Sequence, residues 1–99
     1  MYLGELYFTK GIVDLIENGT ITKNEVMRCV MRHQRGDYGL TDSHDVAVNK
    51  RNLNHSSGTV MSEYVVNGIR IWVITSLSTD VENQYSTVLL PIEYWYKTK

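Results

Sequence analysis

The sequence predicts an α+β fold in which N-terminal helices pack on a three- to four-stranded antiparallel sheet. In the second half of the chain, Asn67-Gly68 lies between two runs rich in β-branched and aromatic residues, which is the strongest short signal for a hairpin. In the first half, apolar residues recur at three and four positions between helix-capping residues. A length of 99 residues with 42% hydrophobic side chains suits one core, so we expect a single domain, 1–99.

The first segment should form a short edge strand followed by a helix. Residues 2–8 alternate loosely between polar and apolar side chains, as a half-buried strand does. Thr9 is then expected to cap a helix that runs to Asn18 and stops at a left-handed Gly19. The predicted buried stripe of this helix comprises Ile12, Val13, Leu15 and Ile16.

A second helix should begin with a capping box. In this motif the Thr22 hydroxyl accepts from the Glu25 amide, and the Glu25 side chain reaches back to the amide of Thr22. The expected apolar face comprises Val26, Met27, Val30 and Met31. The helix should end at Gly36, where Gly36-Asp37-Tyr38-Gly39 predicts an ordered turn with Asp37 accepting hydrogen bonds from backbone or arginine donors.

A mostly solvated third helix should run from Asp42-Ser43 to about Asn54, ahead of the hairpin 59–76. The two-residue hairpin loop fixes the register. The face expected in the core pairs Val66 with Ile69, Tyr64 with Ile71, Ser62 with Val73 and Val60 with Thr75. The opposite face pairs Val65 with Arg70, Glu63 with Trp72 and Met61 with Ile74. A tryptophan between opposite charges is typical of a binding surface, unless the third helix covers it.

The last strand and the C-terminal aromatics complete the predicted layout. A strand from Tyr85 to Leu90 should stop at Pro91, which cannot donate to a sheet. Three aromatic residues follow near a basic end, namely Tyr94, Trp95 and Tyr96. Such residues either dock on their own domain or remain exposed for a partner. We expect them to form the contact of a homodimer.

Charge and cysteine content argue against several classes of function. Ten Lys and Arg against eleven Asp and Glu give a net charge of −1, which suits neither a sequence-independent DNA binder nor an acidic DNA mimic. Cys29 is the one cysteine of the sequence, and the three histidines, His33, His44 and His55, are too widely spaced for a zinc motif. We therefore expect no metal and no cofactor. Without a signal peptide or a membrane-length apolar run, the protein is expected in the cytoplasm.

A metal-independent ribonuclease is one chemistry that the polar residues allow. Such an enzyme needs a general base, a general acid and a cation that binds the phosphate. Residues that could supply these groups are His33, Glu63, Arg70, Tyr64, Ser86 and Thr87. In the structural alternative, Glu63 and Arg70 form a surface ion pair on the sheet and His33 caps its helix.

Four short motifs resemble a family of short proteins carried by bacterial plasmids and phages. The motifs are Arg32-His33-x-x-Gly36-Asp37-Tyr38-Gly39, Ser62-x-Tyr64, Trp72-Val73-Ile74-Thr75 and Ser86-Thr87-Val88-Leu89-Leu90-Pro91-x-Glu93-Tyr94. Members are often labelled plasmid-related protein or, misleadingly, type I restriction subunit M. A methyltransferase subunit needs a Rossmann domain several times this size, so the second label is not literal.

The resemblance implies that the protein belongs to mobile elements that must survive host defence. We therefore expect a protein-binding inhibitor of a CRISPR or restriction system, which blocks a host defence protein or nuclease complex by occlusion. The predicted partner-binding residues are Trp72, Glu63, Arg70, Met61, Asp37 and Tyr38. The alternative is a compact ribonuclease of toxin type, for which nucleic acid would be the substrate.

Overall fold

The computed structural model describes the backbone of residues 1–97 and the side chains of residues 1–94. Its elements are, in chain order, β1 (Glu5–Phe8), α1 (Lys10–Glu17), α2 (Lys23–Gln34), α3 (Ser43–His55), β2 (Thr59–Val66), β3 (Ile69–Ser76), the 3-10 helix η1 (Val81–Asn83), β4 (Tyr85–Leu89) and α4 (Pro91–Lys97). The predicted α+β class is confirmed. Within residues 1–97, no helix has the length and apolar character that a membrane span requires.

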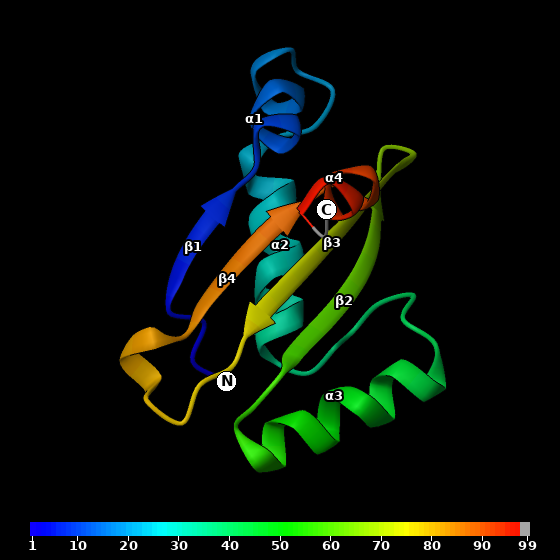
Figure 1. Ribbon diagram of the computed structural model, residues 1–99. Coiled ribbons are helices and arrows are strands. Elements are labelled where there is room, and N and C mark those ends of the chain that lie inside the picture. Colours follow the sequence, from blue (N-terminus) through cyan, green and yellow to red (C-terminus); the bar gives the residue numbers. More distant parts are fainter. Residues whose placement is uncertain (98–99) are drawn as a thin grey trace.

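The four strands form one mixed sheet in the order β1-β4-β3-β2. β3 pairs antiparallel with both β2 and β4, whereas β1 pairs parallel with β4, so the prediction of a wholly antiparallel sheet is wrong at this edge (Figure 1). A two-residue turn imposes an antiparallel arrangement on its strands. β1 and β4 are separated by three α-helices, the hairpin and η1, so no local turn determines their relative direction.

The hairpin between β2 and β3 has the predicted register. Every expected pair is present, from Val66 opposite Ile69 to Val60 opposite Thr75. Asn67 and Gly68 have φ values of 50° and 80°, which a type I′ turn requires at both central positions. Because side chains alternate along a strand, this register determines which residues enter the core.

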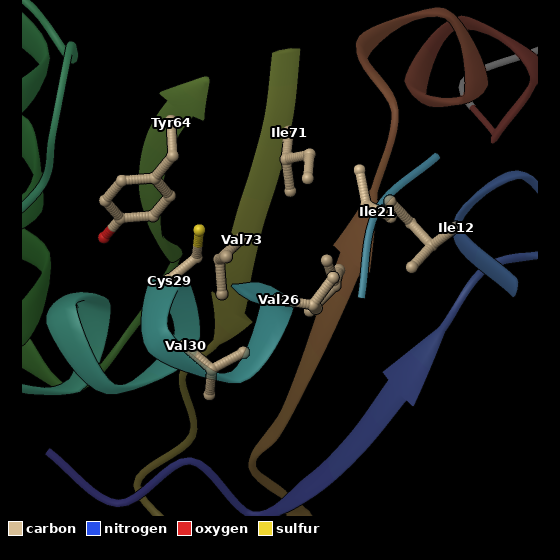
Figure 2. Close-up of a cluster of buried hydrophobic side chains, with 9 residues drawn as sticks. Ile12, Ile21, Val26, Cys29, Val30, Tyr64, Ile71 and Val73 are labelled. Atoms are coloured by element: carbon tan, nitrogen blue, oxygen red, sulfur yellow. The ribbon is translucent and has the colours of Figure 1, made fainter. Parts of the chain in front are cut away.

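α2 covers one face of the sheet and supplies much of the core. Its capping box is present, with the Glu25 amide donating to the Thr22 hydroxyl and the Thr22 amide donating to the Glu25 carboxylate. The buried residues of α2 are Val26, Cys29, Val30 and His33. Figure 2 shows Val26, Cys29 and Val30 beside Ile71 and Val73 of the sheet.

The predicted apolar faces of the first two helices are partly wrong. Met31 is exposed, because the buried stripe of α2 follows a spacing of three, four and seven residues from Val26 and therefore runs through His33. In α1, Ile12 is fully buried but Val13, the next residue around the helix, is exposed. A stripe read only from apolar residues misses a polar residue that is buried with its hydrogen bonds satisfied.

The face of the sheet away from α2 is here called the outer face. Its residues alternate with the buried ones along the strands and include Met61, Glu63, Trp72, Ile74, Thr87 and Leu89. α4 lies over one end of this face, and α3 lies alongside β2 (Figure 1). The sequence left open whether the third helix covers the outer face. In the structure it does not.

Candidate functional site

The outer face brings together four of the six predicted partner-binding residues. Met61 and Glu63 lie on β2, opposite Ile74 and Trp72 of β3. Arg70 is also on this side of the sheet, and its guanidinium lies 2.6 Å from the Glu63 carboxylate. The Glu63 side chain is only 13% exposed while that of Arg70 is 68% exposed, so the pair presents a cation to solvent over a largely buried acid.

Trp72 and Tyr94 form an aromatic pair at the α4 end of the outer face. Their ring centroids are 5.6 Å apart at an interplanar angle of 67°, the edge-to-face arrangement that aromatic rings prefer. Tyr94 is thus docked on its own domain, one of the two arrangements expected for the C-terminal aromatics. The side chains of Trp95 and Tyr96 lie outside the described residues, so the predicted dimer contact of these three residues stays a prediction.

Two polar atoms of this site lack a hydrogen-bond partner among the described residues. They are the indole nitrogen of Trp72 and one carboxylate oxygen of Glu63, both shielded from solvent. That oxygen has the nearby Arg70 guanidinium as an ion-pair partner, although the contact lacks hydrogen-bond geometry. A buried N–H without an acceptor costs about 1 to 3 kcal/mol, so an acceptor that reached Trp72 would be favoured.

A pocket of about 150 Å³ lies beside Tyr94, the aromatic partner of Trp72. Its walls come from three strands and from α4, and they comprise Thr59, Ile74, Ser76, Tyr85, Thr87, Leu89 and Tyr94. The lining combines the apolar side chains of Ile74 and Leu89 with five residues that carry hydroxyl groups. Such a lining suits an apolar side chain that carries a polar end. The sequence did not single out this pocket, because its residues come from separate strands.

His33 lies on the other side of the sheet from Glu63. It is fully buried, with Nδ1 2.6 Å from the Ser62 hydroxyl and Nε2 2.9 Å from the Thr75 hydroxyl. Thr75 in turn hydrogen-bonds Ser86 at 2.7 Å. Burial lowers the pKa of His33 from 6.5 to about 4, and the N-terminal ammonium acts in the same direction, so the ring is neutral at pH 7.

The residues named for a ribonuclease are therefore divided between the two faces. Tyr64 is buried on the α2 side and donates its hydroxyl to the carbonyl of Asp37 at 2.6 Å. Burial raises the pKa of Tyr64 to about 12, which keeps the phenol protonated. His33, Tyr64 and Ser86 thus lie on the covered side, whereas Glu63, Arg70 and Thr87 lie on the outer side. The structure does not bring these residues into one constellation.

Asp37 and Tyr38 lie at the β2 edge, where the Tyr38 carbonyl accepts from the Glu63 amide at 3.3 Å, while the Tyr38 ring packs on His33 on the covered side. Asp37 accepts two hydrogen bonds from Arg32, at 2.7 and 3.2 Å, and one from the Gly39 amide. The hydrogen bonding from Arg32, and to a smaller extent that from the Gly39 amide, holds the pKa of Asp37 below its usual value. Gly36 and Gly39 have positive φ, so the predicted turn is confirmed. At Gly39 a Cβ would stand 2.2 Å from the Glu63 carbonyl oxygen, so only glycine fits there.

Asn49 of α3 is a structural residue that the sequence did not reveal. Its side-chain amide donates to the Met61 carbonyl at 2.8 Å and accepts from the Met61 amide at 3.0 Å. Asn52 donates to the Thr59 carbonyl in the same manner. These bonds occupy backbone groups on the free side of β2. Asparagine spacing on a solvated helix was the available signal, but the strand it contacts could not be known from spacing alone.

Comparison of the chain with known proteins found no matching protein family, no matching curated protein and no matching solved structure. Among the described residues, no group of three or more His, Cys, Asp or Glu side chains is placed to hold a metal ion. The resemblance to plasmid and phage proteins therefore enters the functional argument only as a proposal.

Proposed function

We propose that this protein is a protein-binding inhibitor that uses its outer face to occlude a surface of a bacterial defence protein or nuclease complex. The observation that carries the proposal is the cluster formed by Trp72, Glu63 and Arg70, which Tyr94 connects to a pocket of about 150 Å³. Tryptophan and arginine are the residues most often found at the energetic centre of protein interfaces. The pocket offers a place for a side chain of the partner.

Charge on the outer face favours a protein partner over nucleic acid. Among the described side chains of the outer face, Arg70 is the one basic group, and Glu63 lies against it. Glu5, at the β1 edge, adds another acidic group to this half of the molecule. A nucleic-acid interface needs several cations to replace the counterions of the phosphates. A mixed, partly apolar surface is what a protein contact uses.

The class of partner comes from the resemblance to proteins of mobile elements. Elements of this kind meet restriction and CRISPR nucleases in the cytoplasm, and a small chain can block such an enzyme by covering a working surface. The net charge of −1 supports occlusion through a local patch over imitation of DNA by the whole surface. The ribonuclease alternative has no such support, because His33 is buried away from Glu63 and Arg70.

The test begins with capture of a partner. The tagged protein should recover a restriction or CRISPR complex from lysates of hosts that carry these systems, and its expression should relieve restriction of phage. Recovery of no defence complex, together with unchanged phage restriction, would remove the proposal. Incubation with total RNA gives a parallel check: the RNA should stay intact, and fragments that disappear in a Glu63→Ala variant would favour the enzyme.

Affinity of the captured partner should depend on Trp72. Because this ring lies at the proposed centre of the contact, Trp72→Ala should weaken binding by more than ~2 kcal/mol, about 30-fold. The matched control is Val13→Ala, which removes an exposed apolar side chain on α1, away from the outer face. Calorimetric titration would give both affinities, and denaturant unfolding would show that each variant is folded. Equal affinity for wild type and Trp72→Ala would place the contact elsewhere.

A further inference from the structure

The two edge strands of the sheet are treated differently by the rest of the chain. At the β2 edge, Asn49 satisfies both backbone groups of Met61. Next to it, the Leu40 amide donates to the Glu63 carbonyl at 2.8 Å, and the Glu63 amide donates to the Tyr38 carbonyl at 3.3 Å. An exposed strand edge is a template for another strand, and these contacts block it.

The β1 edge has no comparable cover. The Thr9 amide donates to the Val88 carbonyl at 3.1 Å, so Thr9 turns its N–H toward β4. Backbone N–H and C=O groups point alternately to the two sides of a parallel strand. Those of Leu6 and Phe8 therefore point away from β4. Within residues 1–97, no hydrogen bond from another part of the chain reaches these outward groups, and no element lies beyond β1 (Figure 1).

Apolar side chains lie on both sides of this bare edge. On the covered side, Leu6 and Phe8 line a groove together with Lys23 and Met27 of α2. On the outer side, Tyr7 is 50% exposed and packs edge-to-face on Tyr85, with ring centroids 6.1 Å apart. An unpaired edge flanked by exposed apolar groups fits an added strand, which supplies backbone partners and covers the side chains together.

We propose that β1 pairs antiparallel with β1 of a second copy of this chain, about a two-fold axis at Tyr7. In this register Leu6 of one copy faces Phe8 of the other, and their outward amides and carbonyls complete one another. Residues 5–8 are in the strand and Thr9 is also extended, so the pairing uses backbone that is already in the required conformation. The two sheets join into one continuous sheet.

The strand is complementary to itself in this register. On the covered side, Leu6 meets Phe8 of the other copy, which places apolar groups together. On the outer side, Tyr7 meets the second Tyr7, while each Glu5 lies opposite Thr9, so the two carboxylates stand at opposite ends of the pairing. A net charge of −1 per chain adds little repulsion between copies. This contact is separate from the aromatic C-terminus and from the Trp72 cluster.

Disulfide trapping tests the register. In the proposed register the two Tyr7 residues form a non-hydrogen-bonded pair, because their backbone groups face β4. The Cα atoms of such a pair are about 4.5 Å apart, within reach of a disulfide. A Tyr7→Cys variant should therefore form a covalent dimer under mild oxidation. The matched controls are Glu5→Cys, which faces Thr9, and Val65→Cys, an exposed position on β2; both should stay monomeric. Cys29 is buried and does not compete. A Tyr7→Cys yield no greater than either control would overturn the proposal.

The unmodified chain gives a second, independent measurement. Light scattering at high concentration should give twice the 11.4 kDa mass of one chain. On dimerisation the Leu6 and Phe8 amides should become slow to exchange hydrogen, while the Tyr7 amide, which faces β4, should be slow at every concentration. A monomer at all concentrations overturns the proposal, as does a dimer with fast Leu6 and Phe8 amides. Slow exchange that appears only with a captured defence protein would assign the edge to that partner.

Discussion

The two faces of the sheet differ in how completely their polar groups are satisfied. On the covered face, both nitrogens of the buried His33 have hydroxyl partners, from Ser62 and Thr75. On the outer face, the Trp72 indole N–H has no partner among the described residues, and the buried Glu63 carboxylate depends on an exposed arginine. Buried polar groups are normally paired, and those left unpaired often mark a site of function. This difference supports the proposal that the covered face stabilises the fold and that the outer face binds a partner.

The largest difference in stability should separate Ile71 from Ile74. Both lie on β3, but Ile71 is fully buried under α2 whereas Ile74 is half-buried on the outer face. Ile71→Ala should lower the free energy of unfolding by about 2 to 5 kcal/mol, because it removes contacts and leaves a cavity. Ile74→Ala should lower the free energy of unfolding by clearly less. Urea unfolding of both variants measures the difference, and equal losses would contradict the division between the faces.

His33 should make stability depend on pH. Its pKa is lowered from 6.5 in an unfolded chain to about 4 in the fold, by burial first. Above pH 6.5 the ring is neutral in both states; below it, the unfolded chain gains a proton that the folded chain does not. Stability should therefore fall as the pH drops from 6.5 to 4, and the His33 contribution should be about 3 kcal/mol.

The measurement compares urea unfolding from pH 7 to pH 4 in matched variants. His33→Gln should show a flatter profile than wild type, because it lacks the group whose pKa differs between the folded and unfolded states. The carboxylates that also titrate in this range remain in both proteins and cancel in the comparison. His44→Gln alters an exposed histidine of α3 that lies outside the buried network, and it should keep the wild-type slope. A wild-type profile that His33→Gln leaves unchanged would show that the buried ring does not resist protonation.

How far the sequence predicts this protein depends on how local each signal is. The Asn67-Gly68 turn fixes the register of its own hairpin, and the Thr22 capping box fixes the start of α2, so both were predictable. The parallel direction of β1 and the contact of Asn49 with Met61 depend on segments that meet only in the fold. His33 is instructive, because the predicted register already placed Ser62 and Thr75 on the core face as possible partners.

The divided placement of the candidate site residues has the same cause. Alternation along β2 and β3 predicted that Glu63, Trp72 and Arg70 share a face, since it needs only the hairpin register. His33 lies on the other side because α2 packs on the core face of the hairpin, and the apolar face predicted for α2 did not include this histidine. Docking of Tyr94 on Trp72 likewise depends on the direction in which α4 leaves β4.

The smallest effect on stability should come from the ion pair of the outer face. Glu63 and Arg70 are 2.6 Å apart, but the Arg70 side chain is 68% exposed, so solvent screens their attraction. A double-mutant cycle with Glu63→Gln and Arg70→Gln should give a coupling of about 0.2 to 1 kcal/mol in unfolding free energy, which decreases as salt is added. The same two variants should reduce the free energy of binding to a captured partner by more than they reduce the free energy of unfolding, because the interface removes the ion pair from water. A coupling well above this range, with partner binding unchanged, would instead make the ion pair a structural element and confine the binding surface to Trp72 and the neighbouring pocket.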